Sequence, residues 1–195
     1  DDTRHYLNGI YIHITESDNR TYLTGVATDS HRLSSSSIEI EKGKTLPSLI
    51  LPKKTVFQLC NLLQETEEKI FMQTNETKVQ FKIGKIKLIS KVIDGKFPDY
   101  KKVVPSNNEK KLVVSSKDFI ESIERVTTVS IDRKEGVKLA INKDNINLSV
   151  NSTNSGDGTE VLKANFNDEQ ITISFNSKYL LDIASEIEDK NLKMN

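Results

Sequence analysis

The side chains best suited to chemistry lie in three short segments, around Asp29, Asp94 and Asp99. Asp29 and His31 would be half of an acid–base pair, and the three aspartates together would suit a metal-dependent hydrolase. No serine or cysteine nucleophile in a suitable context accompanies them, and neither a phosphate-binding glycine loop nor a metal-spaced Cys/His set occurs in the sequence. The hydrolase using Asp29, Asp94 and Asp99 is therefore kept only as the alternative. No cofactor and no metal site are predicted.

Charge is balanced in total but unevenly distributed along the chain, with 28 Lys and Arg against 28 Asp and Glu. Residues 82–111 hold nine lysines and three acids (9 − 3 = +6), whereas residues 160–189 hold seven acids and two lysines (2 − 7 = −5). On charge alone the pattern favours an ordinary solvated surface, with faces of opposite sign as the alternative.

The single cysteine, Cys60, cannot form an internal disulfide, and there is no signal-peptide pattern or membrane-length apolar run. A cytoplasmic protein that does not contact membranes is expected. Cys60 is expected in the core, on the apolar side of its helix.

Period-two alternation of apolar residues dominates the chain and predicts strands. The strands are predicted at residues 10–14, 78–83, 86–89, 137–141, 146–150 and 171–175. Turn residues 83–85 and 143–145 lie between paired strands. Apolar residues with helical spacing predict helices at 53–64, 116–127 and 176–187. The first helix follows Pro52, and the second and third begin with Ser116 and Asn176 as predicted caps. The expected fold class is α+β, with antiparallel strands and helices on one face.

Two pairs of segments repeat in pattern and in the same order. Residues 49–57 resemble residues 173–181 at an offset of 124, and residues 9–14 resemble residues 136–141 at an offset of 127. Two copies of one domain are therefore predicted, at 1–104 and 105–195, joined by the polar stretch 105–111.

Three motifs carry a family resemblance. They are Arg4-His5-Tyr6-Leu7-Asn8-Gly9, Ala27-Thr28-Asp29-Ser30-His31-Arg32-Leu33 and Lys91-Val92-Ile93-Asp94-Gly95-Lys96-Phe97-Pro98-Asp99-Tyr100. In order and spacing they resemble the bacterial DNA sliding clamps, the β subunits of DNA polymerase III. The resemblance covers essentially the whole chain and implies the DNA-clamp fold, with most of the middle domain and most of the third. Both ends are expected to be truncated.

In that family, two subunits form a ring around duplex DNA, with helices lining the pore and sheets on the outer rim. The resemblance implies a non-catalytic processivity factor that holds DNA by topology and weak, sequence-independent phosphate contacts. The DNA-contact residues it implies are Arg4, His5, Tyr6, Lys53, Lys54, Lys117, Arg125 and Lys178. His5 stands where the family has tyrosine, so an imidazole replaces the phenol ring available for base stacking.

Partner proteins of these clamps insert an extended peptide between the second and third domains. Carrying that pocket over by position gives Leu7, Thr28, Ser30, His31, Arg32, Leu33, Pro98, Lys102 and Val103. Ser30 replaces a usual glycine and Lys102 an arginine. Because the family's C-terminal tail supplies the remaining wall, weak peptide affinity is expected of this chain.

The resemblance also implies partners: duplex DNA, the catalytic subunit of DNA polymerase III, the clamp loader and other replication and repair proteins. Thr128 and Val129 fall at the family's dimer interface. A homodimer is expected of the full-length protein, and no closed ring of this chain alone.

Overall fold

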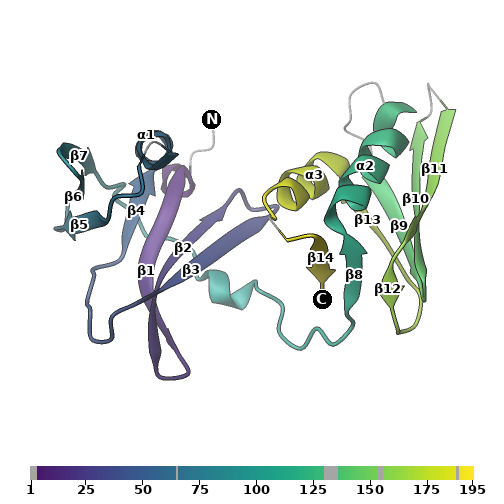
Figure 1. Ribbon diagram of the computed structural model, residues 1–195, viewed down its shortest axis with the longest axis horizontal. Helices are drawn as coiled ribbons and strands as arrows, with labels where there is room; N and C mark the ends of the chain where they lie inside the picture. The colour runs from purple at the N-terminus through teal and green to yellow at the C-terminus, as the bar shows by residue number, and fades with distance from the viewer. Residues whose placement is uncertain (1–3, 65, 130–135, 153–155, 188) are drawn as a thin grey trace. The chain divides into compact units, whose positions relative to one another are not determined.

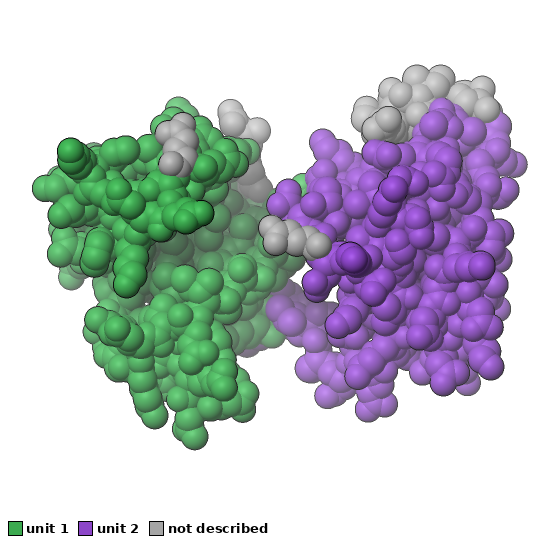
Figure 2. Space-filling view, viewed as in Figure 1, with its two compact units in different colours: residues 1–101 green, residues 102–195 purple. Residues whose placement is uncertain are grey.

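The chain forms two compact units, residues 1–101 and 102–195, shown in green and purple in Figure 2. The computed structural model describes residues 4–64, 66–129, 136–152, 156–187 and 189–195. The units divide close to, but not at, the predicted boundary between residues 104 and 105. Each unit is described by itself.

Unit 1 has two antiparallel sheets, in the strand orders β3-β2-β1-β4 and β5-β6-β7. Helix α1 follows β4 directly and leads to β5 (Figure 1). Its elements are η1 (His5–Leu7), β1 (Gly9–Ser17), β2 (Arg20–Thr28), β3 (Leu33–Ile40), β4 (Leu49–Pro52), α1 (Lys53–Gln64), β5 (Ile70–Thr74), β6 (Lys78–Ile83) and β7 (Ile86–Lys91), with η2 (Tyr100–Lys102) at the division.

Unit 2 also has two antiparallel sheets, in the orders β11-β10-β9-β13 and β12-β8-β14. Helices α2 and α3 contact each other. Its elements are β8 (Leu112–Ser115), α2 (Ser116–Val126), η3 (Thr127–Val129), β9 (Gly136–Asn142), β10 (Asn145–Ser152), β11 (Gly156–Lys163), β12 (Asn165–Phe166), β13 (Ile171–Asn176), α3 (Ser177–Ser185) and β14 (Asn191–Met194).

The larger sheets of the two units share one topology, which agrees with the repeat predicted from the sequence. In each, a meander of three strands is followed by a strand that pairs with the first and runs into a helix. The register agrees as well, since Gly9 pairs with Pro52 and Gly136 with Asn176. These pairs reproduce both sequence offsets, 127 and 124.

The two units differ in how their cores are built. Unit 2 has a single apolar cluster to which both helices and both sheets contribute, centred on Phe119, Ile123 and Leu139. Unit 1 has two smaller clusters. In one, Val56 and Leu59 of α1 pack against strands of both sheets. The other surrounds Val26, Ile50 and Phe97.

Two local predictions were wrong. Cys60 is exposed, because it lies about 100° further around α1 than Leu59, beside the apolar stripe instead of within it. The cap of α2 is Ser115, whose Oγ accepts a hydrogen bond from the Asp118 N–H. Ser116 is instead buried, and its Oγ donates to the Asp189 carbonyl.

The other helix and turn predictions agree with the structure to within two residues at the helix ends. Asn176 caps α3, accepting hydrogen bonds from the N–H groups of Lys178 and Tyr179. The alternation did not reveal β2, β3, β4, β5, β8, β11, β12 and β14. Within the described residues, no helix is long and apolar enough to cross a membrane.

Candidate functional site

The three motifs noted in the sequence meet in unit 1. The Nη1 of Arg4 donates to Ser30 Oγ at 2.7 Å, so the first motif contacts the second. His5 Nε2 lies 3.1 Å from the Asp94 carbonyl oxygen, so the first motif also contacts the third. A Cβ added at Gly95 would lie 3.0 Å from the Tyr6 Cβ, so this approach favours glycine. Segments far apart in sequence therefore form one surface.

The turn between β2 and β3 is held by Asp29. Its Oδ1 accepts hydrogen bonds from the N–H groups of His31 and Arg32, both at 3.0 Å, and its Oδ2 accepts one from Arg32 Nε at 3.1 Å. Partial burial raises the pKa of Asp29, but these donors and the Arg32 charge outweigh it, so the pKa is lowered. Asp29 therefore remains a carboxylate that shapes the turn.

The rim of this surface is polar and its base is apolar. Leu7 and Leu33 are half-buried and pack against Val26 and Phe97. Thr28 Oγ1 donates to the Arg32 carbonyl at 2.7 Å, which leaves the turn residues Ser30 and His31 exposed above the base. Such a surface suits an extended peptide with an apolar anchor.

The predicted pocket residues are divided between the units. Leu7, Thr28, Ser30, His31, Arg32, Leu33 and Pro98 belong to unit 1, whereas Lys102 and Val103 belong to unit 2. Val103 is 69% exposed. The meeting of the two sets in one pocket stays a prediction.

A row of aromatic rings supports the loop that carries Pro98. Tyr11 stacks on Phe97 with ring centres 4.9 Å apart and on His13 at 4.6 Å. His13 Nε2 is hydrogen-bonded to the Tyr100 hydroxyl at 3.1 Å. Sequence reasoning missed this row, although Tyr11 and His13 are two apart in a strand and therefore on one face.

Burial perturbs the two polar members of the row. Desolvation and the nearby Lys101 charge lower the pKa of His13, while the Thr24 backbone acts in the opposite direction. Desolvation raises the pKa of Tyr100, with smaller contributions from Tyr11 and Asp99. Both groups therefore favour their neutral forms.

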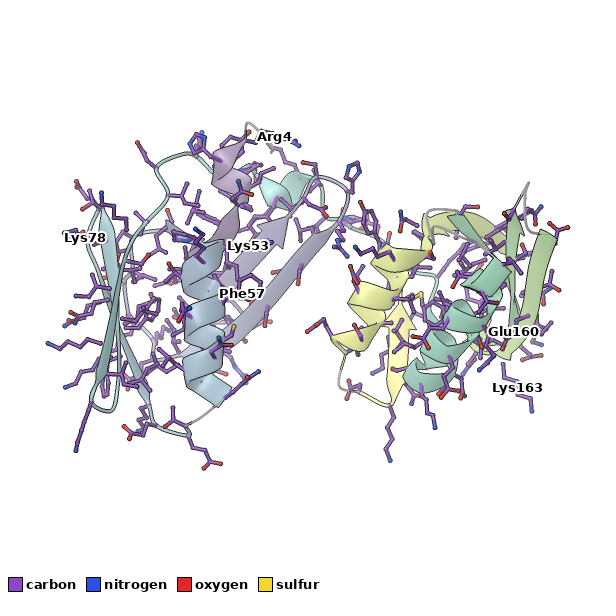
Figure 3. The ribbon with its side chains drawn as sticks, turned by 90° about the horizontal axis from the view of Figure 1, so that it is seen from above. Arg4, Lys53, Phe57, Lys78, Glu160 and Lys163 are labelled. Atoms are coloured by element: carbon purple, nitrogen blue, oxygen red, sulfur yellow. The ribbon has the colours of Figure 1, made fainter. Side chains whose placement is uncertain are left out.

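The predicted DNA-contact lysines share one position, the first turn of a helix. Lys53 and Lys54 open α1, while Lys117 and Lys178 lie in the first turns of α2 and α3. All four are exposed, and Lys53 Nζ lies 5.7 Å from the Phe57 ring centre (Figure 3). Because the N-terminal end of a helix carries partial positive charge, a lysine there adds to a field that attracts anions.

Arg125 shares its charge with two carboxylates, whereas Lys117 forms one longer ion pair, 3.8 Å from Nζ to Glu121. The Arg125 Nε lies 3.1 and 3.2 Å from the two carboxylate oxygens of Glu160, and its Nη1 lies 3.6 Å from Glu121. The hydrogen bonds from Arg125 lower the pKa of Glu160, while those to Glu160 raise the pKa of Arg125. A phosphate would have to compete with this ion pair.

The other predicted contacts lie in or beside the short helices η1 and η3. Arg4 precedes η1, in which His5 is exposed and Tyr6 half-buried. Thr128 and Val129, expected at a subunit interface, lie in η3. Thr128 is exposed and donates to the Arg125 carbonyl at 2.7 Å, and Val129 packs against the core of unit 2.

The structure gives no support to the hydrolase alternative. Within the described residues, no three His, Cys, Asp or Glu side chains are grouped so that they could hold a metal ion. The Asp29 carboxylate is occupied by the donors of its own turn.

Solved structures of bacterial clamps share this fold. A sliding clamp from Bartonella birtlesii, bound to griselimycin, is 41% identical with a TM-score of 0.91, over 99% of this chain and 52% of that one. The Caulobacter crescentus β sliding clamp, with PEG bound to a putative β-motif tethering region, is 36% identical with a TM-score of 0.94 and the same coverage. The fold is thus that of the β sliding clamps.

Sequence comparison identifies the family and its parts. Residues 1–99 match the DNA polymerase III beta subunit, central domain, and residues 101–195 match its C-terminal domain. The β sliding clamp of Caulobacter vibrioides is 37% identical over 96% of this chain, and that of Escherichia coli is 30% identical over 99%. The chain belongs to the DNA polymerase III β subunit family, and it spans about half the length of these relatives.

Proposed function

We propose that this chain is part of a DNA sliding clamp, and that it works by binding without catalysing a reaction. The proposed ring encloses duplex DNA without reading its sequence, and it docks the polymerase catalytic subunit, the clamp loader and other replication and repair proteins. The observation that carries this proposal is the meeting of the three motifs on one surface of unit 1.

Peptide docking would use the apolar base and the polar turn together. Leu7 and Leu33 offer partly exposed apolar surface to a Leu or Phe anchor, and burying such a side chain contributes about 1.5–3 kcal/mol. Backbone and side-chain groups of the Thr28–Arg32 turn would hydrogen-bond the extended peptide. Pro98, Lys102 and Val103 are proposed to complete the pocket. The relative bound to griselimycin supports a ligand-binding surface in this family.

The proposed DNA contact uses lysines at helix starts. Lys53, Lys54, Lys117 and Lys178 are exposed and sit where the helix dipole favours anions. Arg4, His5 and Tyr6 would add contacts at one edge. Such contacts attract phosphates but carry no sequence information, which lets a ring slide. Thr128 and Val129 remain the proposed subunit contacts of the full-length ring.

A peptide titration tests the docking proposal. A polymerase-derived clamp-binding peptide is titrated into the chain and into its Leu33→Ala and His31→Ala variants, with binding followed by NMR shifts. Loss of apolar contact in Leu33→Ala is expected to weaken the affinity about tenfold or more.

The matched control is Ile38→Ala, which removes an exposed apolar side chain from the same strand, outside the apolar cluster under the turn. Its affinity is expected to stay within about twofold of the unsubstituted chain. Equal loss in the control and in Leu33→Ala would contradict the proposed pocket.

A further inference from the structure

The β5–β7 sheet of unit 1 has one face that α1 does not cover. Val79 and Phe81 of β6 point to the core under α1, so Lys78, Gln80 and Lys82 point to the opposite side. Figure 3 shows Lys78 on this sheet, on the side away from α1. The residues that share this side by strand register form what we call the lysine face: Phe71, Gln73, Lys78, Gln80, Lys82, Lys87, Ile89 and Lys91.

Like charges are directly opposite each other on the lysine face. Lys78 pairs with Lys91 and Lys82 with Lys87, and the face includes no acidic residue. Such cross-strand pairs destabilise a sheet. None of these four lysines forms an ion pair with any residue that the structure describes. The chain as a whole has equal numbers of acidic and basic residues, so the positive charge is a property of the lysine face and not of the whole chain.

Protection of a sheet edge does not account for the face. Lysines on edge strands discourage aggregation, and β7 is an edge strand of the described sheet. Lys78 and Lys82, however, lie on the central strand β6, where both neighbours are already paired. A binding site for an anionic partner would account for the lysines of both β6 and β7.

Exposed apolar side chains lie among the lysines. Phe71 is 63% exposed and pairs with Lys82, while Ile89 is 60% exposed and pairs with Gln80. Lys78 and Lys91 also line a cleft of about 910 Å³, together with Lys96 and two acids, Glu76 and Asp94. Lysines that track a phosphate backbone, next to an aromatic ring on which a base can stack, are the combination found in single-strand binding surfaces.

We propose that the lysine face binds single-stranded nucleic acid through its phosphates, with Phe71 stacking on a base. The site is distinct from the helix-start lysines, because it lies on the opposite side of the sheet from α1. It rests neither on the peptide pocket nor on ring closure, so it goes beyond the function proposed above.

Fluorescence anisotropy with a labelled oligothymidine of about 16 nucleotides tests this site at several salt concentrations. The variant Lys82→Glu/Lys87→Glu is expected to bind about tenfold more weakly, with a salt slope reduced by about 1.4, which corresponds to two lost phosphate contacts. Phe71→Ala is expected to weaken binding about tenfold as well. The matched control, Lys143→Glu/Lys163→Glu, makes the same charge change at exposed lysines of unit 2 and is expected to bind within about twofold of the unsubstituted chain.

Two further variants distinguish loss of the lysine face from misfolding and from binding at the helix-start lysines. Lys82→Glu alone places opposite charges across β6 and β7, so it is expected to raise the Tm while it weakens binding, which excludes misfolding as the cause. Lys53→Glu/Lys54→Glu tests the helix start. If that variant loses oligothymidine binding while Lys82→Glu/Lys87→Glu and its control bind equally, the lysine face is not a nucleic-acid site, and the function proposed above is unaffected.

Discussion

Ser30 shows how one residue can be strained and still contribute to a site. Its φ of 75° lies in the left-handed region, where a side chain costs about 1 kcal/mol relative to glycine. Its Oγ accepts the hydrogen bond from Arg4 that joins two of the motifs. The family usually has glycine at this position, and glycine adopts this positive φ without strain. Serine is strained here, but its side chain makes a contact that glycine cannot make.

Substitution of Ser30 separates strain from hydrogen bonding. Ser30→Gly is expected to raise the free energy of unfolding by about 0.5 kcal/mol, because relief of strain exceeds the loss of one exposed hydrogen bond. Ser30→Ala keeps the strain and loses the bond, so the free energy of unfolding is expected to fall by about 0.5–1 kcal/mol. Urea denaturation measures both, and a Ser30→Gly variant as unstable as Ser30→Ala would contradict the strain argument.

His13 gives the stability of unit 1 a defined pH dependence. Its pKa in the folded chain is lowered from 6.5, so the unfolded chain binds more protons once the pH falls below about 6.5. The stabilisation is complete above that pH and is lost as the pH falls through the lower, folded pKa.

We expect His13→Gln to reduce the loss of stability between pH 7.5 and pH 5. Lys101, Tyr100 and Tyr11 are charged and polar neighbours of the ring, and His13→Gln leaves all three in place. Urea midpoints of both proteins at several pH values measure the effect. If the urea midpoints of the two proteins fall in parallel as the pH is lowered, His13 is not the cause of the pH dependence.

At the scale of elements, Gly9 and Gly136 hold equivalent positions in the repeated strand pairs β1–β4 and β9–β13, but the space around the two glycines differs. A Cβ on Gly9 would lie 2.2 Å from the Leu51 carbonyl oxygen, a backbone atom that cannot move aside, whereas the nearest atom to a Cβ on Gly136 is 3.5 Å away. The β1–β4 pair is therefore closer than the β9–β13 pair at the same point of the register.

Alanine substitution tests this difference directly. Gly9→Ala is expected to lower the free energy of unfolding by about 1–3 kcal/mol, because the two strands must separate locally. Gly136→Ala is the built-in control and is expected to cost less than about 1 kcal/mol. Thermal or urea unfolding of each variant gives the comparison, and equal costs would mean that the strands adjust without strain.

At the scale of the whole molecule, the distribution of core residues predicts two unequal units. Unit 2 gathers its buried apolar residues in one cluster, whereas unit 1 divides fewer of them between two clusters. Because apolar burial is the main stabilising contribution, unit 2 is expected to be the more stable.

Hydrogen exchange followed by mass spectrometry measures this directly. Amides of β9 and β10 are expected to exchange at least about tenfold more slowly than amides of β1 and β6, which is a difference of about 1.4 kcal/mol in opening free energy. Val137→Ala is expected to accelerate exchange in unit 2 and leave unit 1 unchanged. Uniform protection throughout the described chain would contradict the division.

The sequence was sufficient for features that depend on local periodicity and turn chemistry. Helix α1 occupies the predicted residues, and the turn at Gly84 has the positive φ that its glycine indicated. Strand β3 was missed because its serines Ser34–Ser37 are exposed and leave no apolar alternation. Cys60 was misplaced because the width of an apolar helix stripe depends on what packs against it.

The sequence by itself determined the family, the repeat and the three motifs, since each depends on the order of residues along the chain. Only the tertiary structure decided that Arg4 contacts Ser30, that Arg125 is held by Glu160, and that Lys82 lies opposite Lys87. These contacts join residues that are far apart in sequence or are set by strand register. Their geometry comes from packing of sheets and helices, which no local pattern specifies.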